Sequence, residues 1–288
     1  MNRTKKLRQL IRRKEILIIP GASDALSAKL IEAAGFEAVY MTGFGTAASA
    51  FGFPDIGLVT MTEMVENAKR ICNAVRIPVI ADADTGYGNH LNVIRTLEEY
   101  YAAGVSAIHI EDQIFPKKCG HMEGHKLIPL EEMGEKIRVA AASKKDKDFV
   151  LIARTDAISA EGFDKAIRRG NRYIEEGADV IFIEAPRTIP ELEKIPKLIK
   201  GPILINVGPK TPNMDAKTFE EMGYAILLYS TICVTTSFLA IREMLNELKK
   251  KGIIKGGWAP ESISFDAFTN FLGLGKYKEL EEKYLRKI

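Results

Sequence analysis

The feature that most constrains the fold of this chain is a nine-residue pattern that occurs four times along it. The four copies are AAGFEAVYM, AAGVSAIHI, EEGADVIFI and EMGYAILLY, at 33–41, 102–110, 175–183 and 221–229. Each copy contains the end of a helix, a glycine suited to the left-handed conformation that closes helices, and a short apolar strand. The chain is therefore expected to repeat a unit in which a strand follows a helix.

Four further apolar runs, each bounded by turn residues, raise the number of expected strands to eight. These runs are ILIIP, PVIADAD, FVLIARTD and PILIN, at 16–20, 78–84, 149–156 and 202–206. Amphipathic helices are expected between the strands, at 24–34, 61–74, 91–103, 130–143, 161–176, 188–199, 215–222 and 232–250. Thr60-Met-Thr-Glu63 has the pattern of a capping box at the start of the second of these helices.

Strict alternation of helices with almost continuously apolar strands predicts a parallel sheet that is buried on both faces. Eight units of about 30 residues each predict a TIM-type (β/α)8 barrel, and a doubly wound open sheet is the alternative. We expect a barrel domain at 1–250 and a C-terminal helical extension at 251–288. The segment KKKGIIKGGW, at 249–258, has the composition of a hinge, and 261–287 is expected to form two more helices.

Composition and charge exclude several classes of protein. Apolar residues make up 46% of the chain and charged residues 27%, as in soluble globular proteins. The net charge of +3 comes from 41 basic and 38 acidic residues spread along the chain, which is no footprint for nucleic acid. The basic N-terminus leads into an apolar run, ILIIP, that is too short for a signal peptide. We expect a cytoplasmic protein that binds neither nucleic acid nor membrane.

Carboxylates follow two adjacent predicted strands, at the end where barrel enzymes place their functional residues. Asp82 and Asp84 end the strand at 78–84, and Glu111 follows the next strand. Hard oxygen ligands of this kind suit Mg²⁺, with Mn²⁺ as the alternative cation. A structural hydrogen-bond network is the other interpretation of these three residues.

Other polar groups are expected at the same mouth of the barrel. Arg154 is suited to bind a substrate carboxylate or phosphate, and Glu184 and Asn206 would complete the polar lining. The glycine-rich stretch TGFGTAASAFG lacks the spacing of a nucleotide-binding loop. The backbone N–H groups of Thr42, Gly43 and Phe44 are expected close to the mouth, where they could bind a small carboxylate.

The segment FPKKCGHMEGH raises the question of what Cys119 does. A zinc site with His121 and His125 is one reading, but a fourth ligand is missing and two lysines adjoin the thiol. A structural cysteine is a second reading, which the polar, glycine-containing loop disfavours. Positive charge from Lys117, Lys118 and His121 could instead tune the thiol as a nucleophile or a proton donor. A general acid needs only reach and a suitable pKa, so this role is favoured.

The chain resembles the isocitrate lyase and phosphoenolpyruvate mutase superfamily, most closely its methylisocitrate lyase and 2,3-dimethylmalate lyase branch. The resemblance extends over almost the whole chain and is carried by eight blocks: YMTGFG, FPDIG, ADADTGYG, IHIEDQ, FPKKCGH, IARTDA, IFIEAP and INVGPKTP. It implies a small-molecule carboxylate as substrate, Mg²⁺ as cofactor and a homotetramer, with the C-terminal helices exchanged between subunits.

The resemblance also implies roles for individual residues. Asp82 would hold Mg²⁺ directly, and Asp84 and Glu111 partly through water. Tyr40 would be a candidate base for the substrate hydroxyl, and Lys117 would order the loop of Cys119. The remaining residues expected at the substrate are Thr42, Gly43, Phe44, Asp55, Gly120, His121, Arg154, Glu184 and Asn206.

The activity that the resemblance implies is cleavage of a carbon-carbon bond in a 2-hydroxy di- or tricarboxylate. The products would be pyruvate and succinate from 2-methylisocitrate, or pyruvate and propionate from 2,3-dimethylmalate, with Cys119 protonating the departing carbon. Met122-Glu123-Gly124-His125 is closer to the dimethylmalate type, and VGPKTP after Asn206 lacks the serines of isocitrate lyases. The alternatives are a phosphonomutase or phosphonopyruvate hydrolase, an oxaloacetate-acting enzyme, and a non-catalytic metabolite-binding barrel.

Overall fold

The computed structural model describes residues 2–253 and 263–285. The chain divides into two compact units, Met1–Thr235 and Thr236–Ile288. The domain boundary expected between residues 250 and 251 remains a prediction, and part of the expected hinge, 254–258, lies outside the described residues.

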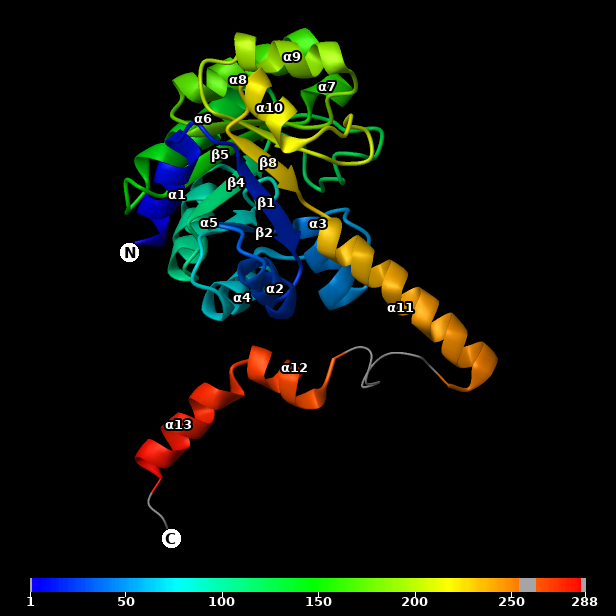
Figure 1. Cartoon of the computed structure of the whole chain (residues 1–288). Coiled ribbons are helices and arrows are strands. Elements are labelled where there is room, and N and C mark those ends of the chain that lie inside the picture. Colours follow the sequence, from blue (N-terminus) through cyan, green and yellow to red (C-terminus); the bar gives the residue numbers. More distant parts are fainter. Residues whose placement is uncertain (1, 254–262, 286–288) are drawn as a thin grey trace. The chain divides into compact units, whose positions relative to one another are not determined.

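Eight parallel strands close into a barrel in the first unit, which confirms the predicted fold and excludes the open sheet (Figure 1). The barrel closes between the first and last strands, where Leu17 pairs with Ile226 and Ile19 with Leu228. The strands are β1 (Leu17–Ala22), β2 (Val39–Met41), β3 (Val79–Asp82), β4 (Ala107–Glu111), β5 (Val150–Thr155), β6 (Val180–Ile183), β7 (Ile203–Asn206) and β8 (Ile226–Tyr229).

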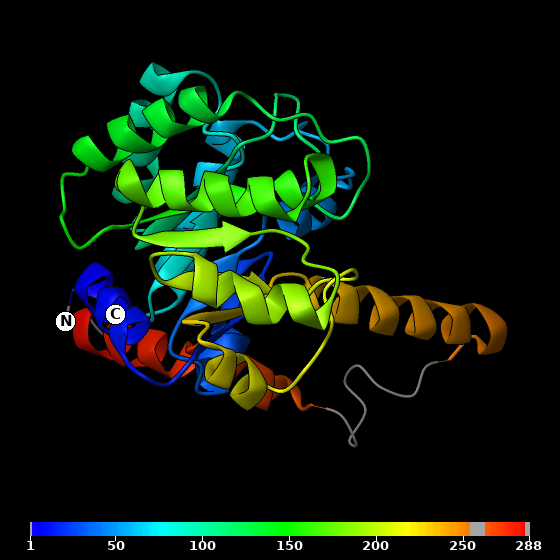
Figure 2. The ribbon, with the colours of Figure 1, turned by 90° about the horizontal axis from the view of Figure 1, so that it is seen from above.

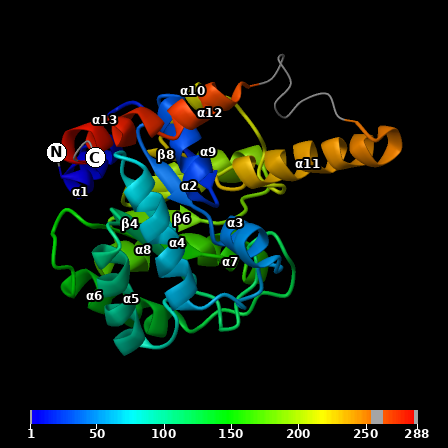
Figure 3. The same ribbon diagram turned by 90° about the horizontal axis from the view of Figure 1, so that it is seen from below.

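The predicted helices form within a few residues of their expected bounds, and those of the barrel unit surround the strands (Figures 2 and 3). The capping box of Thr60 and Glu63 is present at the start of α4. The helices are α2 (Ala25–Ala33), α4 (Met61–Ala74), α5 (His90–Ala102), α6 (Leu130–Ala142), α8 (Phe163–Glu175), α9 (Ile189–Leu198), α10 (Ala216–Met222) and α11 (Ile232–Lys251).

One helix that the sequence analysis did not predict covers the end of the barrel at which the strands begin. The basic N-terminal segment forms α1 (Arg3–Arg12), and its Leu7, Leu10 and Ile11 pack into the cluster of inward-facing strand side chains. Arg8 donates hydrogen bonds to the carbonyl of Phe149, at the start of β5. The helix therefore seals the end of the barrel at which the strands begin. The other unpredicted helical segments are α3 (Gly43–Thr46), the π-helical segment η1 (Ala47–Phe51) and α7 (Ala157–Ala160).

The two-residue alternation of the strands decides which polar side chains reach the barrel axis. On β4, Ile108 and Ile110 face outward into the layer between strands and helices. Ala107 belongs to the inner cluster, so His109 and Glu111 on the same face also point inward. The same alternation places the polar residues at the ends of β2, β3, β5, β6 and β7 around one mouth.

The second unit contains two helices after α11, as expected: α12 (Phe265–Phe271) and α13 (Leu274–Tyr284). None of the described residues of α11, α12 and α13 is buried. Among the described residues, no helix is both long and apolar enough to cross a membrane.

Candidate active site

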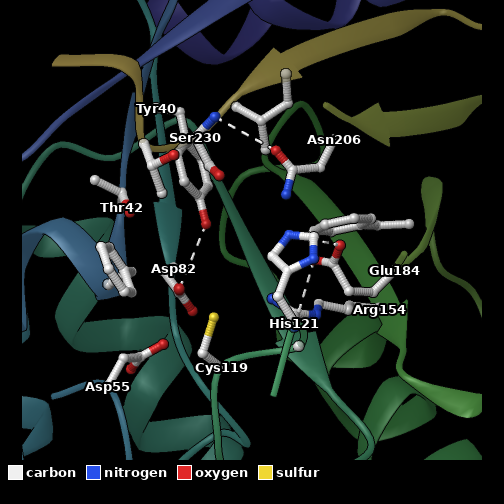
Figure 4. Close-up of a pocket in the computed structure, with 15 residues that line it drawn as sticks. Tyr40, Thr42, Asp55, Asp82, Cys119, His121, Arg154, Glu184, Asn206 and Ser230 are labelled. Atoms are coloured by element: carbon white, nitrogen blue, oxygen red, sulfur yellow. Dashed lines mark hydrogen bonds and ion pairs between the residues drawn. The ribbon is translucent and has the colours of Figure 1, made fainter. Parts of the chain in front are cut away.

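A small cavity of about 40 Å³ lies where the carboxyl ends of the barrel strands converge (Figure 4). Most of the site residues predicted from the sequence line it. These are Tyr40, Thr42, Phe44, Asp55, Asp82, Cys119, Gly120, His121, Arg154, Glu184 and Asn206. The other predicted site residues, Gly43, Asp84, Glu111 and Lys117, lie behind this lining and contact it.

Asp82, at the end of β3, is the most heavily bonded carboxylate of the cavity. Its Oδ2 accepts hydrogen bonds from the Gly43 N–H at 3.2 Å and the Tyr40 hydroxyl at 3.4 Å, and its Oδ1 accepts from the Asp84 N–H at 3.0 Å. Burial opposes ionisation of Asp82, but His109, Lys117 and Arg154, in that order of effect, lower its pKa to about 2. The Gly43 N–H, which was expected to face the substrate, is thus used to hold Asp82 as an anion.

Asp82, His109 and Glu111 form a cluster that could hold a metal ion. One ligand atom of each lies within 4.8 Å of the others, and all three residues are buried. Within the described part of the chain, both carboxylate oxygens of Glu111 lack a hydrogen-bond partner, although Arg154 Nη1 lies 3.3 Å from Oε2. Burial raises the pKa of Glu111 well above its usual range. A buried carboxylate with unbonded oxygens is suited to bind a divalent cation.

His109 was not among the predicted site residues, although it is on the inward face of β4. Its Nε2 lies 2.7 Å from the Tyr40 hydroxyl, and its Nδ1 has no hydrogen-bond partner among the residues that the structure describes. Burial lowers the pKa of His109 to about 4, so its imidazole is neutral at physiological pH. Burial also raises the pKa of Tyr40 well above 10, so in the protein alone this hydroxyl is a proton donor and not a base.

Lys117 forms ion pairs with two buried carboxylates and not with the Cys119 thiol. Its Nζ is 2.5 Å from Asp55 Oδ1 and 2.7 Å from Asp84 Oδ1. Burial alone would lower the pKa of Lys117, but the surrounding carboxylates raise it well above its usual range. Asp84, for which burial raises the pKa to about 6, is thereby tied to the cysteine loop.

Arg154 at the end of β5 is held in place by carboxylates. Its Nε and Nη2 donate to the two oxygens of Asp156, at 3.1 and 2.8 Å, and Glu184 Oε2 lies 3.5 Å from Nη2. The guanidinium also lies over the ring of Phe182, 5.1 Å from its centre. This support, together with Glu111 Oε2 at 3.3 Å from Nη1, fixes the plane of the guanidinium at the edge of the cavity.

The Cys119 thiol points into the cavity (Figure 4). Burial raises its pKa to about 11, the opposite of the lowering that neighbouring positive charge would cause. Lys117 is occupied by Asp55 and Asp84, and the backbone of Lys118 is held by Gln113. The thiol is therefore protonated at neutral pH, which suits an acid better than a nucleophile.

Gly120 next to the thiol has no room for a side chain. A Cβ at this position would lie 2.4 Å from Arg154 Nη2 and 2.5 Å from Glu184 Cγ. The loop can therefore approach the arginine closely only because residue 120 is a glycine.

The three residues of the zinc hypothesis do not converge. His121 Nε2 lies 3.7 Å from Glu184 Oε1, whereas His125 contacts Ser159 and the carbonyl of Cys119. Burial lowers the pKa of His121. The loop histidines thus have separate surroundings, and the zinc reading of this segment is wrong.

The sequence analysis missed four residues of the cavity lining: Phe182, Leu228, Ser230 and Thr231. Ser230 and Thr231 directly follow β8, and the Ser230 N–H donates to Asn206 Oδ1 at 3.4 Å. Their position after a strand was a usable signal, because the same rule identified polar residues at five other strands. Phe182 and Leu228 are core residues whose side chains form the floor.

A closed (β/α)8 barrel with a carboxylate cluster that could hold a cation, a fixed guanidinium and a thiol at its mouth has the features of a barrel enzyme that acts on small molecules. The chain belongs to the phosphoenolpyruvate phosphomutase family, whose model matches residues 7–249. This confirms the superfamily expected from the sequence blocks.

Individual proteins are similar over nearly the full length of the chain. A 2,3-dimethylmalate lyase of Eubacterium barkeri is 44% identical over 286 residues, which cover 99% of each chain. A 2-methylisocitrate lyase of Aeropyrum pernix is 38% identical, over 98% of this chain and 91% of its own length. The structure of an oxaloacetate acetylhydrolase with the inhibitor 3,3-difluorooxalacetate superposes with a TM-score of 0.93 at 36% identity, covering 98% of this chain and 97% of that one.

Proposed function

We propose that this chain is a divalent-cation-dependent carbon-carbon lyase that cleaves 2,3-dimethylmalate to pyruvate and propionate. The observation that carries the proposal is the protonated Cys119 thiol directed into a cavity lined by Asp82 and Arg154. The 44% identity to a 2,3-dimethylmalate lyase supports the same substrate.

The number of positive groups in the lining favours a dicarboxylate over a tricarboxylate. Arg154 is the lining side chain with a permanent positive charge, because burial lowers the pKa of His121 and favours its neutral form. The ammonium of Lys117 is bound to Asp55 and Asp84. Each substrate carboxylate needs a cationic or metal partner once it is removed from water. Arg154 and a cation would serve two carboxylates, whereas 2-methylisocitrate brings a third.

The cation is proposed to be Mg²⁺, held by Asp82 and Glu111, with His109 as a third donor and Asp84 joined through water. Carboxylates with free oxygens are the donors that Mg²⁺ prefers. When bound, the cation would lower the pKa of the substrate 2-hydroxyl and stabilise negative charge on that oxygen.

The residues of the chain would then perform the remaining steps. Arg154 would bind the carboxylate of the departing half, and Tyr40, in its ionised form, would accept the proton of the 2-hydroxyl. The bond between C2 and C3 breaks as the C2 oxygen becomes the ketone of pyruvate, and the electron pair passes to C3. Cys119 donates its proton to C3, which yields propionate, and the thiolate and Tyr40 are later reset by solvent.

The loop of Cys119 is proposed to open and close during turnover. A cavity of about 40 Å³ is narrow for a dicarboxylate, so movement of the lining would ease the entry of substrate. Closure would then bring the thiol to the carbon and exclude water from it.

Oxaloacetate hydrolysis is a second candidate function. It is favoured by the similarity to an oxaloacetate acetylhydrolase and by the Ser230 hydroxyl in the lining. Breaking oxaloacetate into oxalate and acetate requires water to add to its ketone, and an added hydroxyl needs a hydrogen-bond partner in the site. A non-catalytic barrel is disfavoured because the acid, the cation cluster and the guanidinium are all present.

A substrate panel with Mg²⁺ tests these proposals. We expect pyruvate and propionate from 2,3-dimethylmalate, with lower rates for 2-methylisocitrate, isocitrate, oxaloacetate and phosphonopyruvate. Cys119→Ser should reduce cleavage by about 10²- to 10⁴-fold, whereas Cys233→Ser, outside the lining, should not. Oxalate and acetate as the main products would favour the second candidate, and turnover of phosphonopyruvate alone would contradict both.

We also propose that the chain forms a homotetramer through its C-terminal helices. Helix α11 buries none of its residues and exposes large apolar side chains. These are Ile232, Phe238, Leu239, Ile241, Leu245 and Leu248, each at least 40% exposed. Helices that bury no apolar core are not stable alone in water. Another copy of the chain is therefore expected to cover α11, α12 and α13.

A further inference from the structure

We propose that His125 is a positioning residue, which fastens the loop carrying Cys119 to the segment that follows strand β5. Its consequence for catalysis rests on the proposed role of Cys119 as proton donor, but the fastening is a property of the fold. His125 is the histidine of the cysteine loop that remains without a role once the zinc reading is rejected.

His125 bridges two parts of the barrel mouth. It is 9% exposed, its Nε2 lies 3.0 Å from the carbonyl oxygen of Cys119, and its Nδ1 lies 3.0 Å from the Ser159 hydroxyl. Ser159 is in the short helix α7, and its hydroxyl also lies 3.0 Å from the carbonyl of Asp156. One imidazole thus joins the backbone of Cys119 to helix α7, which follows β5.

The hydrogens of this bridge fix the tautomer of the imidazole. A carbonyl only accepts, so Nε2 must carry the proton that is donated to Cys119. In the neutral ring Nδ1 is then an acceptor, and the Ser159 hydroxyl can donate to it. Ser159 has one hydrogen, so it donates either to His125 or to the Asp156 carbonyl, and donation to His125 selects the tautomer that holds the loop.

The bridge completes the fixation of the Cys119 backbone. On the other side of the residue, the Cys119 N–H donates to the Asp55 carbonyl at 3.0 Å. The base of the loop is closed farther away, where the Ile114 N–H donates to the carbonyl of Lys126 at 2.8 Å. Without His125, Cys119 would keep the attachment to Asp55 but lose the one to the β5 side.

Asp156, which follows β5, contacts both the guanidinium of Arg154 and the serine that holds His125. Asp156 binds the Arg154 guanidinium through both carboxylate oxygens, and its carbonyl lies next to Ser159. Through Ser159 and the segment after β5, His125 therefore helps to fix the position of the Cys119 thiol relative to the Arg154 guanidinium. When a proton donor is misplaced by about 1 Å, the reaction rate can fall by about two orders of magnitude. Loss of the His125 bridge is therefore expected to slow proton transfer from Cys119.

The test compares His125→Ala and His125→Gln with Lys126→Ala in the full-length, Mg²⁺-loaded protein. The glutamine amide keeps an N–H donor near the place of Nε2, and Lys126 is an exposed neighbour in the same loop. We expect amide exchange in residues 114–127 and iodoacetamide modification of Cys119 to become about tenfold faster in His125→Ala. With 2,3-dimethylmalate, its kcat should fall about 10- to 100-fold while KM stays within about threefold. His125→Gln should recover most of both effects.

Several results would overturn the inference. These are unchanged exchange and modification rates in His125→Ala, an equal effect of Lys126→Ala, or a loss confined to KM. If His125→Ala fails to fold, as judged by circular dichroism, His125→Gln and Ser159→Ala decide, and Ser159→Ala should speed exchange by a smaller factor. Exchange and modification need no substrate, so they decide the role of His125 even if the chain does not cleave 2,3-dimethylmalate.

Discussion

The ammonium of Lys117 lies 2.5 Å from the carboxylate of Asp55, and both groups are buried. Asp84 shares the same ammonium at 2.7 Å. This triad ties the segment before Cys119 to the loop that follows η1 and to the end of β3. The lysine adjoining the cysteine loop therefore acts on carboxylates and not on the thiol.

Replacing Lys117 with alanine should destabilise the protein strongly. The change would leave Asp55 and Asp84 buried without a counter-ion, a loss that typically costs about 3–5 kcal/mol. Lys118→Ala is the matched control, because the Lys118 side chain is exposed, and it should change the free energy of unfolding by less than about 0.5 kcal/mol. Urea unfolding followed by circular dichroism measures both, and similar values for the two variants would contradict the assignment.

The pKa of Cys119 predicts how reactivity and activity depend on pH. Because burial raises this pKa to about 11, the thiol stays protonated through neutral and mildly alkaline pH. Cleavage should therefore lose its proton donor only as the pH rises toward 11, while alkylation of Cys119 should become faster over the same range. Peptide-level mass spectrometry after iodoacetamide treatment follows the thiol directly. Rapid alkylation at pH 7 would show a thiolate and would favour a nucleophile instead.

The cation cluster predicts which substitutions abolish metal binding. Asp82→Asn removes a carboxylate whose pKa is held near 2, so Mg²⁺ should no longer bind measurably. Glu111→Gln should weaken binding as well, and Asp164→Asn, at an exposed position on α8, should leave it unchanged. Isothermal titration calorimetry with Mg²⁺ gives the affinities without any substrate. Unaltered binding in Asp82→Asn would place the cation elsewhere.

Features that depend on local sequence were predicted correctly, whereas features set by residues far apart in the sequence were not. Strand ends and the inward face depend on local alternation, so Asp82 and Glu111 were predictable at the mouth. His109 has the same alternation as Glu111 and could have been included by the same rule. The direction of Lys117 was not predictable, because it is set by Asp55 and Asp84, which are far away in the sequence.

The pKa of Cys119 was unpredictable for the same reason. Neighbouring lysines and a histidine suggested only that positive charge tunes the thiol, since sequence proximity was the only distance available. In the folded chain burial dominates, because the loop lies over the cavity and Gly120 allows it to approach Arg154. Local sequence therefore identified the reactive group but not the sign of its pKa shift.

A charge on the apolar surface of α11 should disrupt the proposed assembly. Phe238 and Leu245 are two turns apart on this helix, and they are 60% and 53% exposed. Phe238→Glu and Leu245→Glu would each place a carboxylate where a second copy of the chain is expected to pack, which costs several kcal/mol per buried charge. Light scattering coupled to size-exclusion chromatography should show tetramers of the parent chain and smaller species of the variants. Lys249→Glu is the control, because it keeps the added carboxylate but replaces a lysine of the helix's basic end and leaves its apolar side chains intact. A monomeric parent chain, or variants that remain tetrameric, would contradict a helix-mediated assembly.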